Sequence, residues 1–488
     1  MPKSIKQQML SGVFYTAIAK YSGIVISLVI TAILARLILP EEFGVVTTAS
    51  VIIAFFSLFT SMGIGTAIIQ KKELTEEDLN RIFSFTVWSG VVIALLFFVA
   101  SWPIADFYEQ PILRTLCQLL SVNLFFASAN IVPNACFYKN KEFKFIAIRS
   151  FGIQLVVGVV SVVAALLGAG VYALIISPIA SSILYLVVSL YRYPQKLQFT
   201  WGISSIRKIF SYSAYQFLFS VINYFSRNCD KLLIGKAKDM GMADLGYYDK
   251  SYRLMMLPLE NITHVITPVM HPILSDLQND REHLIRSYEK LVKLLGLIGM
   301  PLGVLLYFVA EELTLIVFGP NWMPSVPVFQ ILALSVGIQI IMSSSGSIYQ
   351  ASGDTRSLFI CGVFSATINV AGILLGVFYF GELTMLAGCI VTTFTINFIQ
   401  CYWQMYYVTF RRSLRFFFAQ IYRPILLALL LAVCLYPVYQ WMVGMNMFIT
   451  LGVKSILALL IWLAFVHLTH EYDIIAEARK IIGKVRRH

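Results

Sequence analysis

The chain has 488 residues, of which 58% are hydrophobic and 13% are charged, and its mean hydropathy is +0.78. An apolar excess of this size excludes the soluble globular classes and indicates a protein that crosses a membrane many times. The net charge of +12 does not indicate a nucleic-acid partner, because the basic residues lie in short loops between apolar runs, where they orient the chain in the bilayer.

Long apolar runs predict about fourteen transmembrane helices, since each run can cross about 30 Å of hydrocarbon. The first six are expected near residues 11–39, 43–69, 82–102, 112–137, 145–169 and 171–191. After a basic connector, the other eight are expected near residues 209–235, 245–273, 291–310, 323–348, 357–380, 384–408, 421–443 and 447–468. The first run is too long for a cleavable signal peptide and carries Lys20, so we expect it to remain as the first span.

The positions of Lys and Arg predict that both chain termini are cytoplasmic. Loops on the N-terminal side of the membrane carry most of the cations, as cytoplasmic loops do, and the opposite loops are nearly bare. Four cations on the outer side break the pattern: Lys236, Lys238, Lys250 and Arg253. They either attract an anion near the outer mouth or lie in a loop that tolerates a few cations. The amphipathic tail at residues 472–488 is expected to lie along the inner leaflet.

The seventh run combines a hydrophobic span with charged residues. Its polar residues alternate at spacings of three and four, which places them on one helical face: Ser213, Gln216, Ser220, Asn223, Arg227 and Asp230. Charged side chains are costly in hydrocarbon and normally face a protein interior or a watery cavity. This face therefore predicts a polar, cationic path through the bilayer. The alternative is a polar seam that holds two helices together.

Two weak internal repeats lie roughly six spans apart. Residues 35–44 and 235–246 each place a cationic outer end and a short acidic turn before an apolar residue and a glycine. Arg149 and Arg356, each followed by Ser, open the fifth and eleventh spans. Repeats of six spans keep one orientation, so we expect an all-α protein with two six-helix lobes around a central cavity and two further C-terminal helices. The expected domains are residues 1–200 with the basic connector, residues 201–410, and residues 411–488 with the tail.

Several motifs together resemble a known family of membrane proteins. Gly63–Gln70, followed by Leu74–Leu79 and Phe83, resembles the second-to-third-helix signature of Wzx-type polysaccharide flippases. Further matching segments are Ser275–Gln278, Tyr288, Pro301, Phe318–Trp322, Val326–Val328, Ile331–Leu334 and Gln350–Arg356. The resemblance covers most of residues 10–410 and is nearest to the colanic-acid and teichuronic-acid exporters of the multidrug/oligosaccharidyl-lipid/polysaccharide exporter superfamily.

The resemblance implies a transporter in the bacterial cytoplasmic (inner) membrane, not an enzyme, and no cofactor. Such a protein moves an undecaprenyl-diphosphate-linked oligosaccharide from the inner to the outer leaflet, by alternating access, for exopolysaccharide, O-antigen or capsule assembly. Its expected partners are this lipid-linked glycan, membrane lipids, a polysaccharide polymerase and export machinery, with no nucleic acid. The charged residues agree with this, because a diphosphate that crosses a low-dielectric slab needs compensating cationic donors.

The candidate site residues each have a structural alternative. The cations expected to bind the diphosphate are Lys20, Arg227, Lys231 and Arg253, although Lys20 can instead snorkel to the interface. The residues that can couple transport to ions are Asp230, Glu260 and His264. Asp230 can instead neutralise Arg227, and Glu260 and His264 can belong to a structural ion pair or a capped kink. Sugar contacts are expected from Asn223, Asn397 and Gln400, although helix–helix hydrogen bonds explain most such amides.

No catalytic or metal-ligating residue is expected. The seven cysteines mostly lie in apolar runs and show neither metal-ligand spacing nor a disulfide framework. A polyprenyl-linked glycan polymerase or transferase would need a sizeable soluble loop for its active site, and the outer loops here are short. No P-loop motif for nucleotide binding is present. An ion-coupled multidrug antiporter of the same superfamily is the closer alternative, but it predicts an acidic cavity, whereas the intramembrane charge here is mostly basic.

Overall fold

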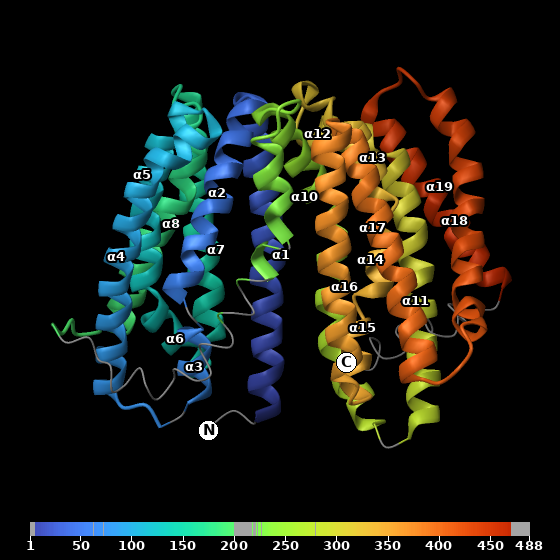
Figure 1. Cartoon of the computed structure of the whole chain (residues 1–488), viewed down its shortest axis with the longest axis horizontal. Helices are drawn as coiled ribbons and strands as arrows, with labels where there is room; N and C mark the ends of the chain where they lie inside the picture. The colour runs from blue at the N-terminus through green and yellow to red at the C-terminus, as the bar shows by residue number, and fades with distance from the viewer. Residues whose placement is uncertain are drawn as a thin grey trace. The chain divides into compact units, whose positions relative to one another are not determined.

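The computed structural model describes residues 5–469, apart from 62, 72, 200–216, 218–220, 222, 226 and 279. Every regular element in these residues is a helix (Figure 1). Among the described residues, eleven helices are long and apolar enough to cross a membrane, or twelve if the bent pair Ser325–Ala333 and Val336–Ala351 forms one span. The chain is therefore an all-α, multi-pass membrane protein, as predicted. The predicted tail helix at residues 472–488 lies outside the described residues.

The predicted count of fourteen spans is not confirmed. Much of the predicted span at 209–235 lies outside the described residues. The predicted span at 245–273 is a helix, α10 (Met242–Asp276), but it does not count among the apolar spans. It carries charged residues along much of its length, such as Asp249, Arg253 and Glu260, and these lower its hydropathy.

The helices form two compact units. Unit 1 contains Met1–Asp249 and Val317–Asn321, and unit 2 contains Lys250–Ile316 and Trp322–His488. The helices of unit 1 are α1 (Ile5–Leu37), α2 (Pro40–Ser61), α3 (Ile64–Gln70), α4 (Glu76–Tyr108), α5 (Pro111–Ala129), α6 (Ile131–Lys139), α7 (Phe143–Leu166), α8 (Tyr172–Arg192), helical residues 227–234 and the start of α10. Within the unit, α1 packs on α7, α4 and α8 pack on α5, and α3 packs on α6.

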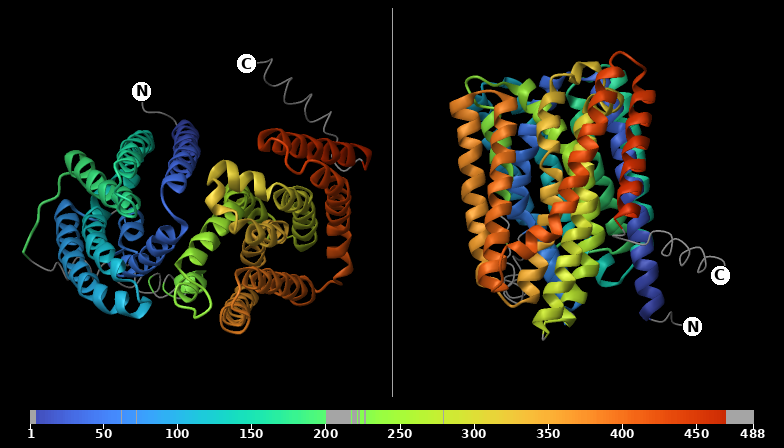
Figure 2. Two further views of the ribbon diagram at one scale, coloured as in Figure 1. Left: turned by 90° about the horizontal axis from the view of Figure 1, so that it is seen from above. Right: turned by 90° about the vertical axis from the view of Figure 1, so that its right-hand side faces the viewer.

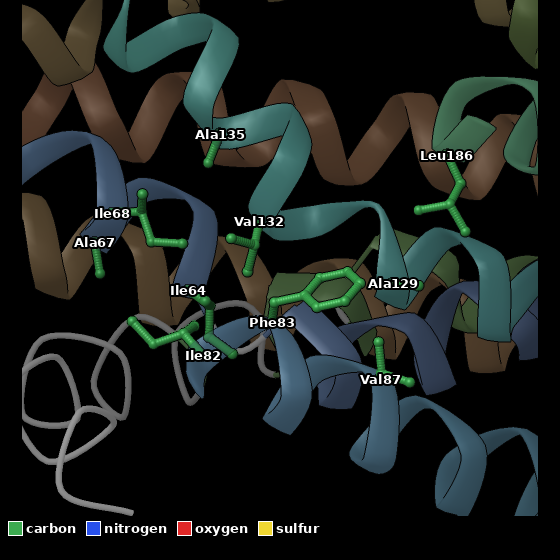
Figure 3. Close-up of a cluster of buried hydrophobic side chains, with 10 residues drawn as sticks. All are labelled: Ile64, Ala67, Ile68, Ile82, Phe83, Val87, Ala129, Val132, Ala135 and Leu186. Atoms are coloured by element: carbon green, nitrogen blue, oxygen red, sulfur yellow. The ribbon is translucent and has the colours of Figure 1, made fainter. Parts of the chain in front are cut away.

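The predicted span at 43–69 is divided into α2 and α3. Gly63 has a φ of +69°, in the left-handed region that glycine adopts readily, and it ends the straight run. The short helix α3 then packs on α6 in a buried apolar cluster that also takes side chains from α4, α5 and α8 (Figure 3). The members of this cluster are Ile64, Ala67, Ile68, Ile82, Phe83, Val87, Ala129, Val132, Ala135 and Leu186. The glycine and the apolar residues of the Gly63–Gln70 motif thus form a break and a packing surface.

The helix α4 begins with a capping box. The Thr75 hydroxyl accepts a hydrogen bond from the Asp78 backbone N–H at 3.2 Å, and the Asp78 carboxylate accepts one from the Thr75 N–H at 3.3 Å. The connector after α8 then lies along the start of α4, where Lys196 and Gln198 donate backbone hydrogen bonds to Asn80 and Ser84 at 2.7 and 2.8 Å. These contacts explain the polar residues at the start of the third span.

Unit 2 contains the second half of the chain. Its helices are the rest of α10, α11 (Arg281–Phe308), α12 (Ala310–Val317, whose last residue belongs to unit 1), α13 (Ser325–Ala333), α14 (Val336–Met342), α15 (Ser345–Ala351), α16 (Thr355–Leu374), α17 (Leu383–Gln404), α18 (Arg415–Trp441) and α19 (Met447–Leu468). π-Helical turns, η2 (Leu375–Phe380) and η3 (Met405–Thr409), extend α16 and α17. Within this unit, α11 packs on α18 and α14, α16 lies beside α17, and α18 lies beside α19 (Figure 2).

Candidate substrate site

The charged segment of the seventh predicted span is helical from residue 227 to residue 234. Two tyrosine hydroxyls hold this segment within unit 1. Tyr108 at the end of α4 donates to the Leu232 carbonyl at 3.1 Å, and Tyr224 donates to the Val51 carbonyl on α2. The polar face is therefore fixed by hydrogen bonds to two apolar helices of the same unit.

Asp230 is buried and binds the start of α10. One oxygen of its carboxylate accepts the Tyr248 hydroxyl at 2.6 Å, and the other accepts the Lys231 backbone N–H at 2.8 Å. Asp230 thus bonds to Tyr248 rather than to Arg227, which is exposed. An exposed guanidinium can present its planar fork to an incoming anion.

Lys231 lies one turn beyond Arg227 and forms an ion pair. Its ammonium is 2.7 Å from the Asp249 carboxylate, and the two side chains are only 19% and 16% exposed. Asp249 was not predicted, because it lies 18 positions after Lys231 and gives no local signal; the turn that leads into α10 brings the two together. In this conformation the charge of Lys231 is therefore compensated by the protein itself.

The other predicted cations and titratable groups lie on α1 and α10. Lys20 is half-buried on α1 in unit 1. Arg253 and Glu260 are exposed and lie on the part of α10 that belongs to unit 2. His264 lies on α10, but its side chain is outside the described residues.

The predicted sugar-binding amides divide by burial. Asn223 is exposed in unit 1. In unit 2, Asn397 is buried on α17 and donates to the Ser365 hydroxyl of α16 at 2.8 Å. Gln400 donates to the Gln404 side-chain oxygen at 2.6 Å, which is a contact within α17. The Asn397 bond joins two helices, as the structural alternative expects.

The cations predicted to lie on the outer side are partly neutralised by the chain. Lys236 binds Glu109 through an ammonium–carboxylate contact of 2.6 Å, and its hydrogen bond and charge lower the pKa of Glu109. Lys250 is buried, and Lys238 and Arg253 are exposed. Of these four cations, Lys236 is therefore held in an ion pair and Lys250 is shielded from solvent.

Two buried cations, Lys454 and Arg149, were not among the predicted site residues. Lys454 in α19 is 2% exposed; its ammonium binds the Glu312 carboxylate and donates to the Phe308 carbonyl at 2.9 Å. A single lysine within the last apolar run was the available signal. Arg149 in α7 is buried and donates to the side chains of Asn134 and Ser189 at 2.7 and 2.8 Å.

The cluster in unit 1 offers the donors that an anion needs. An exposed guanidinium and an ammonium lie one turn apart, and a carboxylate competes for the ammonium. Guanidinium and ammonium groups bind phosphate oxygens through charge-assisted hydrogen bonds. Among the described residues, no group of three or more His, Cys, Asp or Glu side chains could hold a metal ion.

Curated relatives match most of the chain. The chain is 26% identical over 430 residues to the teichuronic acid biosynthesis protein TuaB of Bacillus subtilis, and the match covers 87% of each chain. It is also 26% identical over 430 residues to the lipopolysaccharide biosynthesis protein WzxC of Escherichia coli, with 87% of this chain and 86% of the relative covered. The succinoglycan biosynthesis transport protein ExoT of Rhizobium meliloti is 23% identical over 389 residues, covering 78% and 77%.

Solved structures share the fold. The lipid II flippase MurJ in an inward closed conformation superposes with a TM-score of 0.75 at 14% identity, covering 95% of this chain and all of that chain. An inward-facing multidrug resistance transporter of the MATE family gives a TM-score of 0.60 at 14% identity, covering 80% and 96%. At these identities the likeness concerns the fold alone. The model of the family described as polysaccharide biosynthesis protein matches residues 33–327, more than half of the sequence. The chain belongs to this polysaccharide biosynthesis protein family.

Proposed function

We propose that the chain is a flippase that moves a lipid-diphosphate-linked oligosaccharide from the inner to the outer leaflet of the bacterial cytoplasmic membrane. The main support for this proposal is the match to the polysaccharide biosynthesis family over residues 33–327. The chain also has at least eleven helices able to span a membrane. Two relatives are named for the biosynthesis of teichuronic acid and of lipopolysaccharide, and a third for succinoglycan transport. Both termini are cytoplasmic, and the glycan passes afterwards to a polymerase and export machinery.

The charged cluster supports a role in carrying the diphosphate. An unpaired ion in hydrocarbon is costly, so a pyrophosphate must exchange its hydration shell for fixed donors. Arg227 is exposed and can make planar, two-pronged hydrogen bonds to phosphate oxygens. Lys231 joins it after the ammonium leaves Asp249, so substrate and carboxylate compete for one cation. The polyprenyl tail stays in lipid while the head group moves by alternating access between the two predicted lobes, 1–200 and 201–410.

A depletion experiment tests the proposed function. We expect loss of the protein to stop export of the glycan and to leave its lipid-linked precursor on the inner leaflet, where added enzymes cannot reach it from outside. Re-expression of the wild-type chain should restore export. The multidrug antiporter remains the competing function, because the MATE transporter shares the fold. Normal export after depletion, together with new sensitivity to cationic drugs, would favour the antiporter over the flippase.

A further inference from the structure

Two cations lie near each other where α11 packs on α18 in unit 2. Lys293 belongs to α11 and Arg423 belongs to α18, and both side chains are half-buried. The charge of Arg423 is close enough to repel that of Lys293. Neither residue was among the predicted site residues. Two like charges on neighbouring apolar helices repel each other less when an anion lies between them.

A close contact between the helices brings the two cations together. A Cβ atom on Gly296 of α11 would lie 2.9 Å from the ring of Pro424, the residue after Arg423 in α18. The two helices therefore approach closely one turn from Lys293. Trp462 of α19 donates a hydrogen bond from its indole nitrogen to the Leu297 carbonyl of α11 at 2.7 Å, so a third helix is fixed to the same stretch. Packed helices, and not a loop, thus present the cations.

Tyr422 orients the guanidinium of Arg423. The Arg423 Nε donates a hydrogen bond to the Tyr422 hydroxyl at 2.6 Å, and the guanidinium carbon is 5.6 Å from the centroid of the tyrosine ring. This bond uses one of the five N–H groups that a guanidinium carries. The planar arrangement of the N–H groups matches the oxygens of a phosphate, which an ammonium contacts as a point charge.

The surface of α18 beyond Arg423 suits the acyl chains of a lipid. By the predicted topology, α11 and α18 both begin on the inner side, and the helical rise places Lys293 about 18 Å and Arg423 about 12 Å from those starts. Leu426 and Leu430 follow Arg423 by three and seven residues, which places all three on one helical face. The two leucines are 52% and 44% exposed. The face therefore changes from cationic to apolar in the direction of the membrane midplane.

We propose that Lys293 and Arg423 bind the phosphate group of an anionic phospholipid from the inner leaflet, at the junction of α11 and α18. The ammonium and the guanidinium both donate to the phosphate oxygens, through hydrogen bonds that charge strengthens. The acyl chains lie along Leu426 and Leu430. Basic pockets between transmembrane helices on the cytoplasmic side are suited to anionic head groups. The site requires the proposed orientation of the chain but not its transport activity.

Binding of phosphatidylglycerol to the purified full-length protein tests the site. The affinity can be measured by native mass spectrometry of the protein in detergent as the lipid is added. We expect the Lys293→Gln/Arg423→Gln double variant to bind about tenfold more weakly than the wild type, or weaker still, because two charge-assisted hydrogen bonds are lost. The matched control is Arg415→Gln, which removes an exposed cation from the start of α18 and should leave the affinity unchanged.

A charge-retaining variant separates lost binding from misfolding. Lys293→Arg/Arg423→Lys should keep most of the affinity, because both positive charges remain. If the double glutamine variant does not accumulate, each single variant is measured instead and should bind several-fold more weakly. Wild-type affinity in the folded glutamine variants would refute the site. An equal loss in Arg415→Gln would also refute it, because only a general attraction between cations and anionic lipid would remain.

Two further probes identify the ligand. Phosphatidylcholine, whose head group has no net charge, should bind the wild type more weakly than phosphatidylglycerol does; equal binding would show that no anion site contributes. Inorganic phosphate should raise the unfolding temperature less than phosphatidylglycerol, because it has no acyl chains. An equal rise would show that the cations take a soluble anion, and would overturn the lipid site. None of these measurements requires a transported glycan, so their outcome is independent of the export experiment.

Discussion

At the residue scale, the charges of the seventh predicted span are not equivalent. Arg227 is exposed, Asp230 is bound to Tyr248, and Lys231 is bound to Asp249. Local spacing placed all three on one helical stretch but could not assign their partners. Their different surroundings give each residue a different expected effect when it is changed.

Replacement of Arg227 tests the diphosphate contact. We expect Arg227→Ala to abolish glycan export without reducing membrane insertion, because an exposed side chain contributes little to packing. Arg227→Lys should retain partial export, since an ammonium keeps the charge but loses the planar fork. Export should be measured at matched expression, and the Arg227→Ala/Lys231→Ala double variant should also be inactive. Normal export by this double variant would show that the substrate site lies elsewhere.

Substitutions of Asp230 and Tyr248 distinguish a structural role of Asp230 from a role in ion coupling. Tyr248→Phe removes a hydrogen bond to a buried carboxylate, so we expect a loss of about 1.5–3 kcal/mol in stability with residual export. If Asp230 only holds α10, Asp230→Asn should behave in the same way. The measurements are the thermal unfolding of the purified protein and export in cells. Complete loss of export by a well-folded Asp230→Asn protein, while Tyr248→Phe still exports, would instead assign ion coupling to Asp230.

Among the helices, buried polar contacts determine which neighbours pair, because apolar packing alone does not select one apolar helix over another. Lys454 holds α19 to Glu312 of α12 and to the last residue of α11, all within unit 2. Asp354 caps α16 and also binds Thr409 of η3. The first contact was not predicted, because the partners are separated by 142 residues.

We expect the loss of either Lys454 or Glu312 alone to destabilise the protein more than the replacement of both. Lys454→Met leaves a buried carboxylate without its cation, and breaking a buried ion pair in this way costs about 3–5 kcal/mol. The Lys454→Met/Glu312→Leu double variant should recover much of that loss, because apolar replacements of both partners are often tolerated. Thermal unfolding of the wild type, both single variants and the double variant completes the cycle. A double variant less stable than either single variant would contradict this reading.

We expect Asp354 to make a pH-dependent contribution to stability at the start of α16. Its carboxylate accepts the Ser357 N–H at 3.0 Å and the Thr409 hydroxyl at 2.7 Å. Burial raises the pKa of Asp354, but the hydrogen bonds from Thr409 and Ser357 together with the charge of Arg356 outweigh it, and the net pKa lies below the ordinary value of 3.8. A carboxyl group with a lowered pKa contributes stability above its unfolded-state pKa and loses it as pH falls through the folded-state value.

The corresponding experiment compares the wild type with Asp354→Ala across pH. The difference in unfolding temperature should be full at pH 7 and should shrink below about pH 4, as the carboxyl group of the wild type becomes protonated. Asp354→Asn is the control, because its amide oxygen can still cap the helix. A difference that stays constant down to pH 2 would show that the charge of Asp354 does not contribute.

At the scale of the whole molecule, the topology is the quantity to measure. Single cysteines at Glu41, Glu382 and Gly444 should be labelled from outside by an impermeant reagent, in a chain without other cysteines. Cysteines at Lys139 and Arg411 should be protected, because cation-rich loops stay in the cytoplasm. Protection of the first three sites with labelling of the last two would reverse the orientation.

The membrane class and the helical fold were predicted from sequence patterns, because hydrocarbon imposes a long apolar run for each crossing. The family resemblance was recognised from short motifs. The break at Gly63 and the Thr75–Asp78 capping box were not predicted, although both depend on neighbouring residues. Which charges are paired depends on how the helices pack and could not be predicted. Asp249 pairs with Lys231, and Glu312 pairs with Lys454. The partners are far apart in sequence, and the fold brings them together. The close backbone approach of α2 and α10 at Gly44 and Gly246 was likewise not predicted, because a sequence does not show which helix packs against a glycine.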